Sequence, residues 1–430
     1  MRWPVILYAL AAAVLVGASA FELSRDDTAD LSISINVIAP PGATPVPAPT
    51  TSPLAPVPAA GPGLAVGITE FNPNLVAADT PAPEPWEQAR QAIGALDPTF
   101  FRLVIDWHHL QATAEAPADL NKPETGCMRE VQPCLGWAGV RQQLAALASR
   151  QKEDPDRWQT LVVLTGTPEW AAAPPSGCER EKATVRARAP RPETLPAYRQ
   201  LVLDVLTVAR EEGATLRFWS PWNEPNLPPF VSPQRAECDP ASPSLAPGVY
   251  TELAKTLTSA LDEAPGEQQL VIGETAGLLK DTKLVTSVGE FIRGLPEELV
   301  CSSTVYSQHA YIGGRDPVEQ AATALAARGC PEPHTIWITE TGVGPAPEEY
   351  SAVPDPAAAG CRDLHERLVQ WWNDPRVTVA FQYTVREDDK FPVGLFSTDL
   401  TETRPALREW QAWGGARPAT APPPADACGT

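Results

Sequence analysis

The sequence predicts a TIM barrel, a closed (β/α)8 fold, for residues 64–415. In this region short apolar runs of strand length alternate eight times with longer stretches whose apolar residues have helical spacing. The short runs are almost continuously apolar, which is typical of strands covered on both faces. A strand followed by a helix, repeated along the chain, indicates parallel strands joined by crossover helices. The region also exceeds the roughly 250 residues that a TIM barrel needs.

The eight expected strands are rich in Val, Ile, Leu, Thr and aromatic residues. They are Leu64–Ile68, Phe101–Asp106, Leu161–Thr165, Phe218–Trp222, Leu270–Gly273, Thr304–His309, Thr335–Thr339 and Val377–Tyr383. The expected helices are Trp86–Leu96, Val140–Arg150, Tyr198–Glu212, Tyr250–Glu263, Leu284–Arg293, Val318–Arg328, Arg362–Asn373 and Ala406–Trp413. An open doubly wound sheet is the alternative. No Gly-x-Gly-x-x-Gly motif follows the first strand, which argues against the dinucleotide-binding version of that fold.

The two ends of the chain differ in composition from the barrel region. Residues 1–20 have a positive start, an apolar run and the small residues Ala18-Ser19-Ala20, a pattern typical of a secretory signal peptide. The run is almost long enough to cross a bilayer, so an uncleaved N-terminal anchor is the alternative. Residues 21–63 are predicted to be a disordered Pro-rich linker, because this composition buries too little apolar surface to fold. The Pro- and Ala-rich residues 416–430 are predicted to form a flexible tail.

Charge and cysteine content indicate an exported protein. The chain has 53 acidic and 33 basic residues and a net charge of −20, which argues against nucleic acid or anionic lipid as a partner. Eight cysteines without a Cys-x-x-Cys pair favour disulfides in an oxidising compartment over a zinc site. We therefore expect a secreted protein, or one tethered to the cell surface, and a monomer by default. Many connectivities are open, and the pairs expected are Cys127–Cys134, Cys178–Cys238, Cys301–Cys330 and Cys361–Cys428.

Two carboxylates stand where expected strands end. The fourth strand runs into Asn223-Glu224-Pro225, and the seventh into Thr339-Glu340-Thr341. In a TIM barrel the carboxyl ends of the strands form the face that carries the active site. A facing pair of carboxylates is what glycosidic bond cleavage requires, one as acid and one as base or nucleophile. Glu274, after the fifth strand, is the rival for the second role.

The motif Trp222-Asn223-Glu224-Pro225-Asn226-Leu227, followed far downstream by Ile338-Thr339-Glu340-Thr341-Gly342, resembles the clan A retaining glycoside hydrolases. The sequence of the first motif is most similar to that of glycoside hydrolase family 39, and family 5 is the next most similar family. The resemblance implies that Glu224 is the acid/base and Glu340 the nucleophile. Two strand ends depart from these families. The eighth strand has Tyr383 where many relatives have a Trp, and the third lacks the His common in family 5.

The same resemblance assigns substrate-binding roles to other strand ends. Asn223 would bind the sugar 2-hydroxyl, His309 and Tyr311 would touch the nucleophile, and the charge of Arg102 would hold Glu340 ionised. Tyr383 or Phe381 would replace the missing Trp as the floor of the sugar site, unless another element provides that floor. Independently, aromatic faces stack on sugars, so four tryptophans near strand ends are candidate platforms, although each could equally be a core residue. These are Trp107, Trp137, Trp170 and Trp222.

The function expected from these residues is hydrolysis of an O-glycosidic bond, β-linked by the resemblance, by double displacement. A carbohydrate is the expected partner, and neither a metal nor an organic cofactor is expected. Transfer to a sugar acceptor uses the same groups and stays open. So does a catalytically silent barrel that binds carbohydrate at the cell surface, because a fold does not determine a function.

Overall fold

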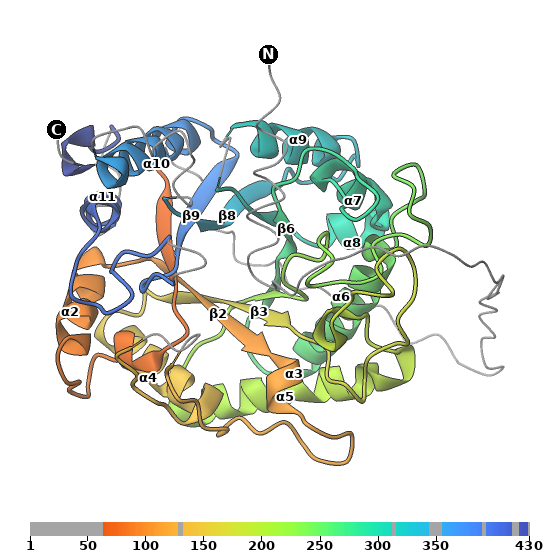
Figure 1. Cartoon of the computed structure of the whole chain (residues 1–430), viewed down its shortest axis with the longest axis horizontal. Helices are drawn as coiled ribbons and strands as arrows, with labels where there is room; N and C mark the ends of the chain where they lie inside the picture. Colours follow the sequence, from red (N-terminus) through yellow and green to blue (C-terminus); the bar gives the residue numbers. More distant parts are fainter. Residues whose placement is uncertain are drawn as a thin grey trace.

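The computed structural model describes residues 63–127, 132–311, 315–343, 355–388, 393–414 and 421–428. A ring of helices surrounds a barrel of parallel strands (Figure 1). The strands are β1 Ala65–Thr69, β2 Phe100–Asp106, β3 Gln159–Thr165, β4 Phe218–Ser220, β5 Gln269–Leu270, β6 Ile272–Ala276, β7 Val305–His309, β8 Thr335–Thr341 and β9 Val377–Tyr383. The α-helices are α2 Trp86–Leu96, α3 Trp107–Leu110, α4 Gly139–Glu153, α5 Leu195–Glu212, α6 Ala246–Glu263, α7 Val288–Gly294, α8 Glu297–Cys301, α9 Arg315–Ala326, α10 Pro356–Trp372 and α11 Pro405–Trp413.

The order of the strands closes the barrel. The sheet runs β5-β4-β3-β2-β1-β9-β8-β7-β6, with every pair parallel. Its two outer strands, β5 and β6, are separated only by Val271, whose N–H donates to the Trp219 carbonyl at 2.8 Å. They are two parts of one extended segment, so the sheet meets itself there. The TIM barrel predicted from the sequence is confirmed, with the fifth expected strand interrupted at Val271.

A small aromatic core fills the inside of the barrel below the strand ends. The rings of Phe100, Phe218 and Trp337 pack with centroids 4.8–5.9 Å apart, and Phe381 lies 6.0 Å from Phe100. Gly67 on β1 makes room for Phe381, since a Cβ at Gly67 would lie 2.3 Å from that ring. This layer closes the bottom of the barrel and leaves the mouth free for polar side chains.

The helices bury one apolar face each against the outer side of the strands. In α5 this face comprises Tyr198, Leu201, Val202, Val205, Leu206, Val208 and Ala209, and Gly213 ends the helix with a left-handed φ of 80°. The expected helix Leu284–Arg293 begins only at Val288. Ser287 has extended backbone there, and its hydroxyl accepts the Glu290 N–H at 3.1 Å, so it is the N-cap.

Four disulfides connect the expected cysteine pairs: Cys127–Cys134, Cys178–Cys238, Cys301–Cys330 and Cys361–Cys428. They indicate folding in an oxidising compartment. The last one holds the short 3-10 helix Ala425–Cys428 against α10, so the end of the segment expected to be a flexible tail is attached to the barrel. The expected signal or anchor and nearly all of the linker lie outside the described residues. No helix within the described ranges has the length and hydropathy to cross a membrane.

Candidate active site

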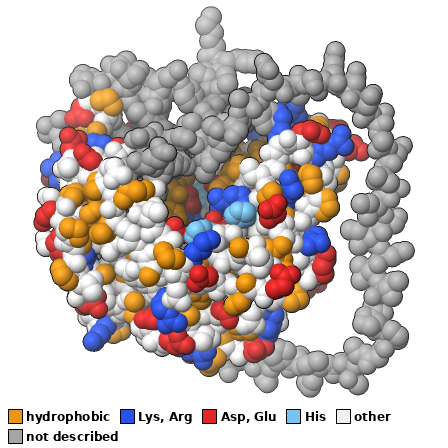
Figure 2. Space-filling view, turned by 60° about the horizontal axis from the view of Figure 1, so that its bottom comes forward, with side chains coloured by type: hydrophobic (Ala, Val, Ile, Leu, Met, Phe, Trp, Pro, Cys, Tyr) orange, Lys and Arg blue, Asp and Glu red, His pale blue; other side chains and the backbone are white. Residues whose placement is uncertain are grey.

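The carboxyl ends of the strands surround one cavity of about 580 Å³. A space-filling view shows acidic, basic and histidine side chains around a hollow on one face of the molecule (Figure 2). Eight of the residues singled out in the sequence contribute to the cavity wall: Arg102, Trp137, Asn223, Glu224, His309, Tyr311, Glu340 and Tyr383. Residues from five different strand ends therefore meet in one place, as the barrel topology requires.

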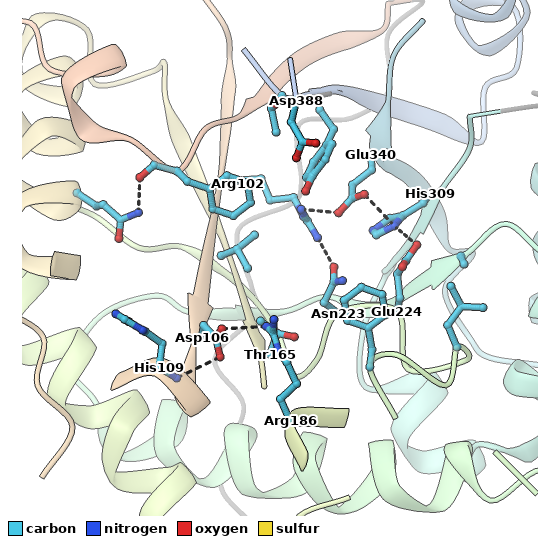
Figure 3. Close-up of a pocket in the computed structure, with 18 of the residues that line it drawn as sticks. Arg102, Asp106, His109, Thr165, Arg186, Asn223, Glu224, His309, Glu340 and Asp388 are labelled. Carbon is cyan, nitrogen blue, oxygen red and sulfur yellow. Dashed lines mark hydrogen bonds and ion pairs between the residues drawn. The ribbon is translucent and has the colours of Figure 1, made fainter. Parts of the chain in front are cut away.

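Arg102 on β2 contacts three polar side chains, those of Asn223, Glu274 and Glu340. Its guanidinium is fully buried and contacts Glu340 Oε1 at 2.8 Å and Asn223 Oδ1 at 2.6 Å (Figure 3). It also contacts Glu274 Oε2 at 2.6 Å. A buried guanidinium needs such acidic and polar partners. Its planar fork fixes the orientation of Asn223 and of the Glu340 carboxylate at the same time.

Glu274 on β6 belongs to this support and not to the cavity wall. Its side chain is 0% exposed, whereas those of Glu224 and Glu340 are 15% and 10% exposed. Burial opposes ionisation of Glu274, but the charges of Arg102 and His309 prevail and lower its pKa to about 2. Glu274 is thus a permanently ionised partner of Arg102, without access to a substrate.

His309 at the end of β7 lies between the two exposed carboxylates. Its Nδ1 is 2.8 Å from Glu224 Oε1 and 3.3 Å from Glu340 Oε2 (Figure 3). Its Nε2 is 3.4 Å from Glu274 Oε2. Burial alone would lower the pKa of His309, but Glu340 and Glu224 raise it to about 10. The imidazole is therefore a cation at neutral pH, held among three carboxylates.

The charge of Arg102 lowers the pKa of Glu340, but other effects act in the opposite direction. Burial raises the pKa of Glu340, and the charges of His309 and Arg102 only partly oppose this. The neighbouring carboxylates Glu224 and Glu274 raise its pKa as well. Sequence reasoning identified the cation but could not weigh burial and like charges against it.

The backbone turns sharply after β4, where Glu224 enters the wall of the cavity. The expected strand to Trp222 ends at Ser220, and Glu224 itself has a φ of 39°, a left-handed conformation rare for a residue with a side chain. The Glu224 N–H donates to the Glu274 carbonyl at 2.8 Å, and the Asn226 amide bonds both the N–H and the carbonyl of Ala276. These bonds to β6 hold the turn in place.

Two tyrosines complete the wall around Glu340. The Tyr311 hydroxyl donates to Glu340 Oε2 at 2.8 Å. Tyr383, at the end of β9, lines the cavity and packs edge-on against Phe71 with ring centroids 6.2 Å apart. Burial raises the pKa of both tyrosines far above the usual range, so both hydroxyls keep their protons.

The candidate aromatic platforms separate into one cavity residue and three packing residues. Trp137 lines the cavity, on a hairpin closed by two backbone hydrogen bonds to Glu124. Trp107 is 0% exposed and packs edge-on against Trp170, and neither of the two is part of the cavity wall. Trp222 is also buried and donates to the Phe230 carbonyl. Trp107 is buried in this contact, whereas Trp170 is half-buried and donates to the Gln111 carbonyl at 3.0 Å.

Sequence reasoning missed the polar residues on the β2 and β3 side of the cavity. Asp106 pairs with Arg186 at 2.9 Å, and His109 pairs with Glu124 at 2.5 Å. Figure 3 shows Asp106, Arg186 and His109 as a group apart from Glu224 and Glu340. Asp388, beyond β9, also lines the cavity. Asp106 ends a strand, which was a usable signal, whereas the loop residues carry none.

Two clusters in the described part of the chain have the donor atoms of a metal site. Glu224, His309 and Glu340 each offer an atom within 4.8 Å of the others, and His309 Nδ1 is in contact with both carboxylates. Cys361, Cys428 and Glu409 form the second cluster, but its two sulfurs are joined in a disulfide and are not thiolate ligands.

Neither a protein-family model nor a curated protein sequence matches this chain. Solved structures do match, at low identity. SrfJ from Salmonella typhimurium is 11% identical, with a TM-score of 0.53 over 85% of this chain and 76% of its own. A GH39 β-xylosidase from Caulobacter crescentus is 16% identical, with a TM-score of 0.50 over 81% and 70%. The catalytic domain of the GH30 xylanase C from Talaromyces cellulolyticus is 11% identical, with a TM-score of 0.50 over 82% and 75%. The chain shares their barrel fold.

Proposed function

We propose that the protein is a retaining O-glycoside hydrolase acting on a β-linked carbohydrate. The observation that carries the proposal is the pair of partly exposed carboxylates, Glu224 and Glu340, in one cavity. Oxygen atoms of the two lie within 4.8 Å of each other. A retaining pair is about 5–5.5 Å apart, whereas an inverting pair needs about 6.5–9.5 Å to admit a water. The spacing therefore supports double displacement.

In the first step a Glu340 oxygen attacks the anomeric carbon, and a proton from Glu224 goes to the leaving oxygen as its bond to carbon breaks. The products are a free alcohol and a glycosyl ester on Glu340. In the second step Glu224 accepts a proton from water, whose oxygen attacks the anomeric carbon and releases Glu340. Both carboxyl groups return to their initial state, so no metal or organic cofactor is needed.

The surrounding residues suit these steps. Asn223, held by Arg102, presents its amide to a sugar hydroxyl beside the reacting carbon. The His309 cation and the Tyr311 hydroxyl stabilise Glu340 as an anion, both before attack and when the ester breaks. Trp137 and Tyr383 offer aromatic faces to sugar rings in the cavity.

Exchange of Glu340 for Gln tests the proposal. We expect kcat/KM on aryl β-glycosides to fall about 10⁴-fold or more, because the covalent intermediate cannot form. A small anionic nucleophile such as azide should restore turnover in Glu340→Gly and yield a glycosyl azide of inverted configuration. The exposed Glu169, which lies outside the cavity, is the matched control, and Glu169→Gln should keep full activity.

Three results would contradict parts of the proposal. Activity that survives Glu340→Gln but is lost in Glu274→Gln would move the nucleophile to Glu274. A wild type that binds oligosaccharides but cleaves no glycoside in a broad panel would indicate a carbohydrate-binding barrel. Products longer than the substrate at high acceptor concentration would indicate a transglycosylase with the same residues.

We further propose that the protein acts outside the cell, with residues 1–20 as signal or anchor and residues 21–63 as linker. The four disulfides support export.

A further inference from the structure

The wall of the active-site cavity has two halves of different chemistry. The half formed by β2, β3 and their loops carries charged and polar side chains, among them Asp106, Glu124 and Arg186. The half formed by the loops after β4, β6 and β7 is apolar. Beyond the polar groups at the strand ends, its described residues are Leu227, Phe230, Ala276, Gly277, Leu278 and Ala310. Glu224 stands on the boundary between the halves.

The apolar half is a built part of the fold. Leu227 follows the turn of Glu224, and its N–H donates to the Glu224 carbonyl at 3.0 Å. Leu227, Ala276 and Val285 form a buried cluster of their own, against which Phe230 and Leu278 pack. The Asn226 amide, bonded to Ala276, ties the β4 loop to the β6 loop. The apolar surface therefore has a defined position relative to the Glu224 carboxylate.

The chemistry of double displacement decides which part of a substrate meets this surface. The leaving oxygen must lie next to Glu224, which protonates it, and it departs on the side away from Glu340. The leaving group therefore extends from Glu224 over the loops after β4 and β6. The glycone, on the other side of the broken bond, faces the charged and polar half.

A second sugar at the leaving-group position would need partners for several hydroxyl groups. Apart from the groups beside the reacting bond, Asn223, Glu224, His309 and Tyr311, the side chains lining this half within the described ranges have no hydrogen-bonding group. Polar groups placed against such a surface lose their bonds to water without replacement. An alkyl or aryl group instead gains free energy from burial there.

We propose that the leaving group of the natural substrate is an apolar alcohol, so that the substrate is the glycoside of an apolar aglycone. The inference rests on the proposed hydrolysis and names its substrate class. The site breaks the bond between the anomeric carbon and the oxygen of the apolar alcohol, and the alcohol leaves with the proton of Glu224.

The test compares octyl and methyl β-glycosides of the same sugar, for glucose, xylose, galactose and mannose. We expect kcat/KM of the wild type to be about tenfold or more higher for the octyl member of the pair that is cleaved. Leu278→Asn should remove most of this preference by lowering kcat/KM for the octyl glycoside much more than for the methyl glycoside. The adjacent Leu279, which is 42% exposed and outside the cavity, is the control, and Leu279→Asn should behave as the wild type.

Binding of the alcohol itself does not depend on the sugar or on turnover. Saturation-transfer NMR with 1-hexanol should give a signal with the wild type and Leu279→Asn, reduced several-fold in Leu278→Asn. No signal with the wild type, or an equal one in all three proteins, overturns the apolar site. Equal cleavage of octyl and methyl glycosides overturns it too and leaves the proposed hydrolysis intact. A chain that binds hexanol but cleaves no glycoside contradicts the hydrolysis instead.

Discussion

At the scale of single residues, the site depends on the charge of His309. Its imidazole is in contact with Glu224 and Glu340, and these carboxylates raise its pKa to about 10. One cation thus lies between the two carboxyl groups of the proposed acid/base and nucleophile. Burial raises the pKa of Glu340, and His309 is the first of the groups that lower it again. The histidine therefore controls the pH at which the proposed nucleophile becomes an anion.

Substitution of His309 by Gln should move the acid limb of the kcat/KM profile to higher pH. Without the cation the pKa of Glu340 rises further, and the anionic nucleophile forms only at higher pH. The measurement is kcat/KM against pH, with His108→Gln as a control outside the cavity. An acid limb that stays in place or moves to lower pH would show that His309 does not set the ionisation of Glu340.

At the scale of elements, the barrel floor is set by the contact between β1 and β9. Gly67 pairs with Phe381 in the register of these strands, and the ring of Phe381 covers the position that a Cβ would take. Phe381 is fully buried against Phe100 and Trp337. A side chain at Gly67 therefore has to displace an aromatic ring in a packed layer, directly below the strand ends that carry the site.

Gly67→Ala should destabilise the protein by about 1–3 kcal/mol, because a methyl group enters a filled core. Gly248 is the matched control. It is exposed in α6 and a Cβ there meets nothing within 4 Å. Gly248→Ala should leave stability unchanged or raise it by about 0.5–1 kcal/mol, since Ala is the better helix former. Urea unfolding measures the change in the free energy of unfolding for both. Equal changes in the two variants would show that the aromatic layer accommodates the extra methyl group without loss of stability.

At the scale of the whole molecule, the four disulfides close loops of very different lengths. Cys361 and Cys428 are 67 residues apart and join α10 to the 3-10 helix near the C-terminus, across β9 and α11. Cys127 and Cys134 are only 7 residues apart, in the loop before Trp137. Because a cross-link restricts the unfolded chain more when it closes a longer loop, the two disulfides should contribute unequally.

Removal of the long-range disulfide by Cys361→Ala and Cys428→Ala should lower the free energy of unfolding by about 4 kcal/mol. Removal of the short one by Cys127→Ala and Cys134→Ala should lower it by about 2 kcal/mol. Guanidinium unfolding of both double variants beside the wild type measures the difference. A larger loss from the short loop would mean that native contacts, and not chain entropy, dominate the effect.

The sequence by itself determined the architecture and the two carboxylates of the candidate site. The alternation of strands and helices predicts a barrel, and a barrel brings the carboxyl ends of its strands together, so Glu224 and Glu340 had to meet at one mouth. This inference needs only local periodicity and one topological rule. The same is not true of Trp107 and Trp170, which stand equally near strand ends but lie outside the cavity.

The tertiary structure decided what depends on distance and burial. That Arg102 contacts Glu274 as well as Glu340 follows from the position of β6 across the barrel. The exclusion of Glu274 from the cavity, the raised pKa of Glu340 and the apolar half around Leu227 have the same origin. Solvent access and the sum of nearby charges arise only when separate loops come together. The spacing of residues along the chain does not indicate solvent access or nearby charges, whereas it does indicate the period of each strand and helix.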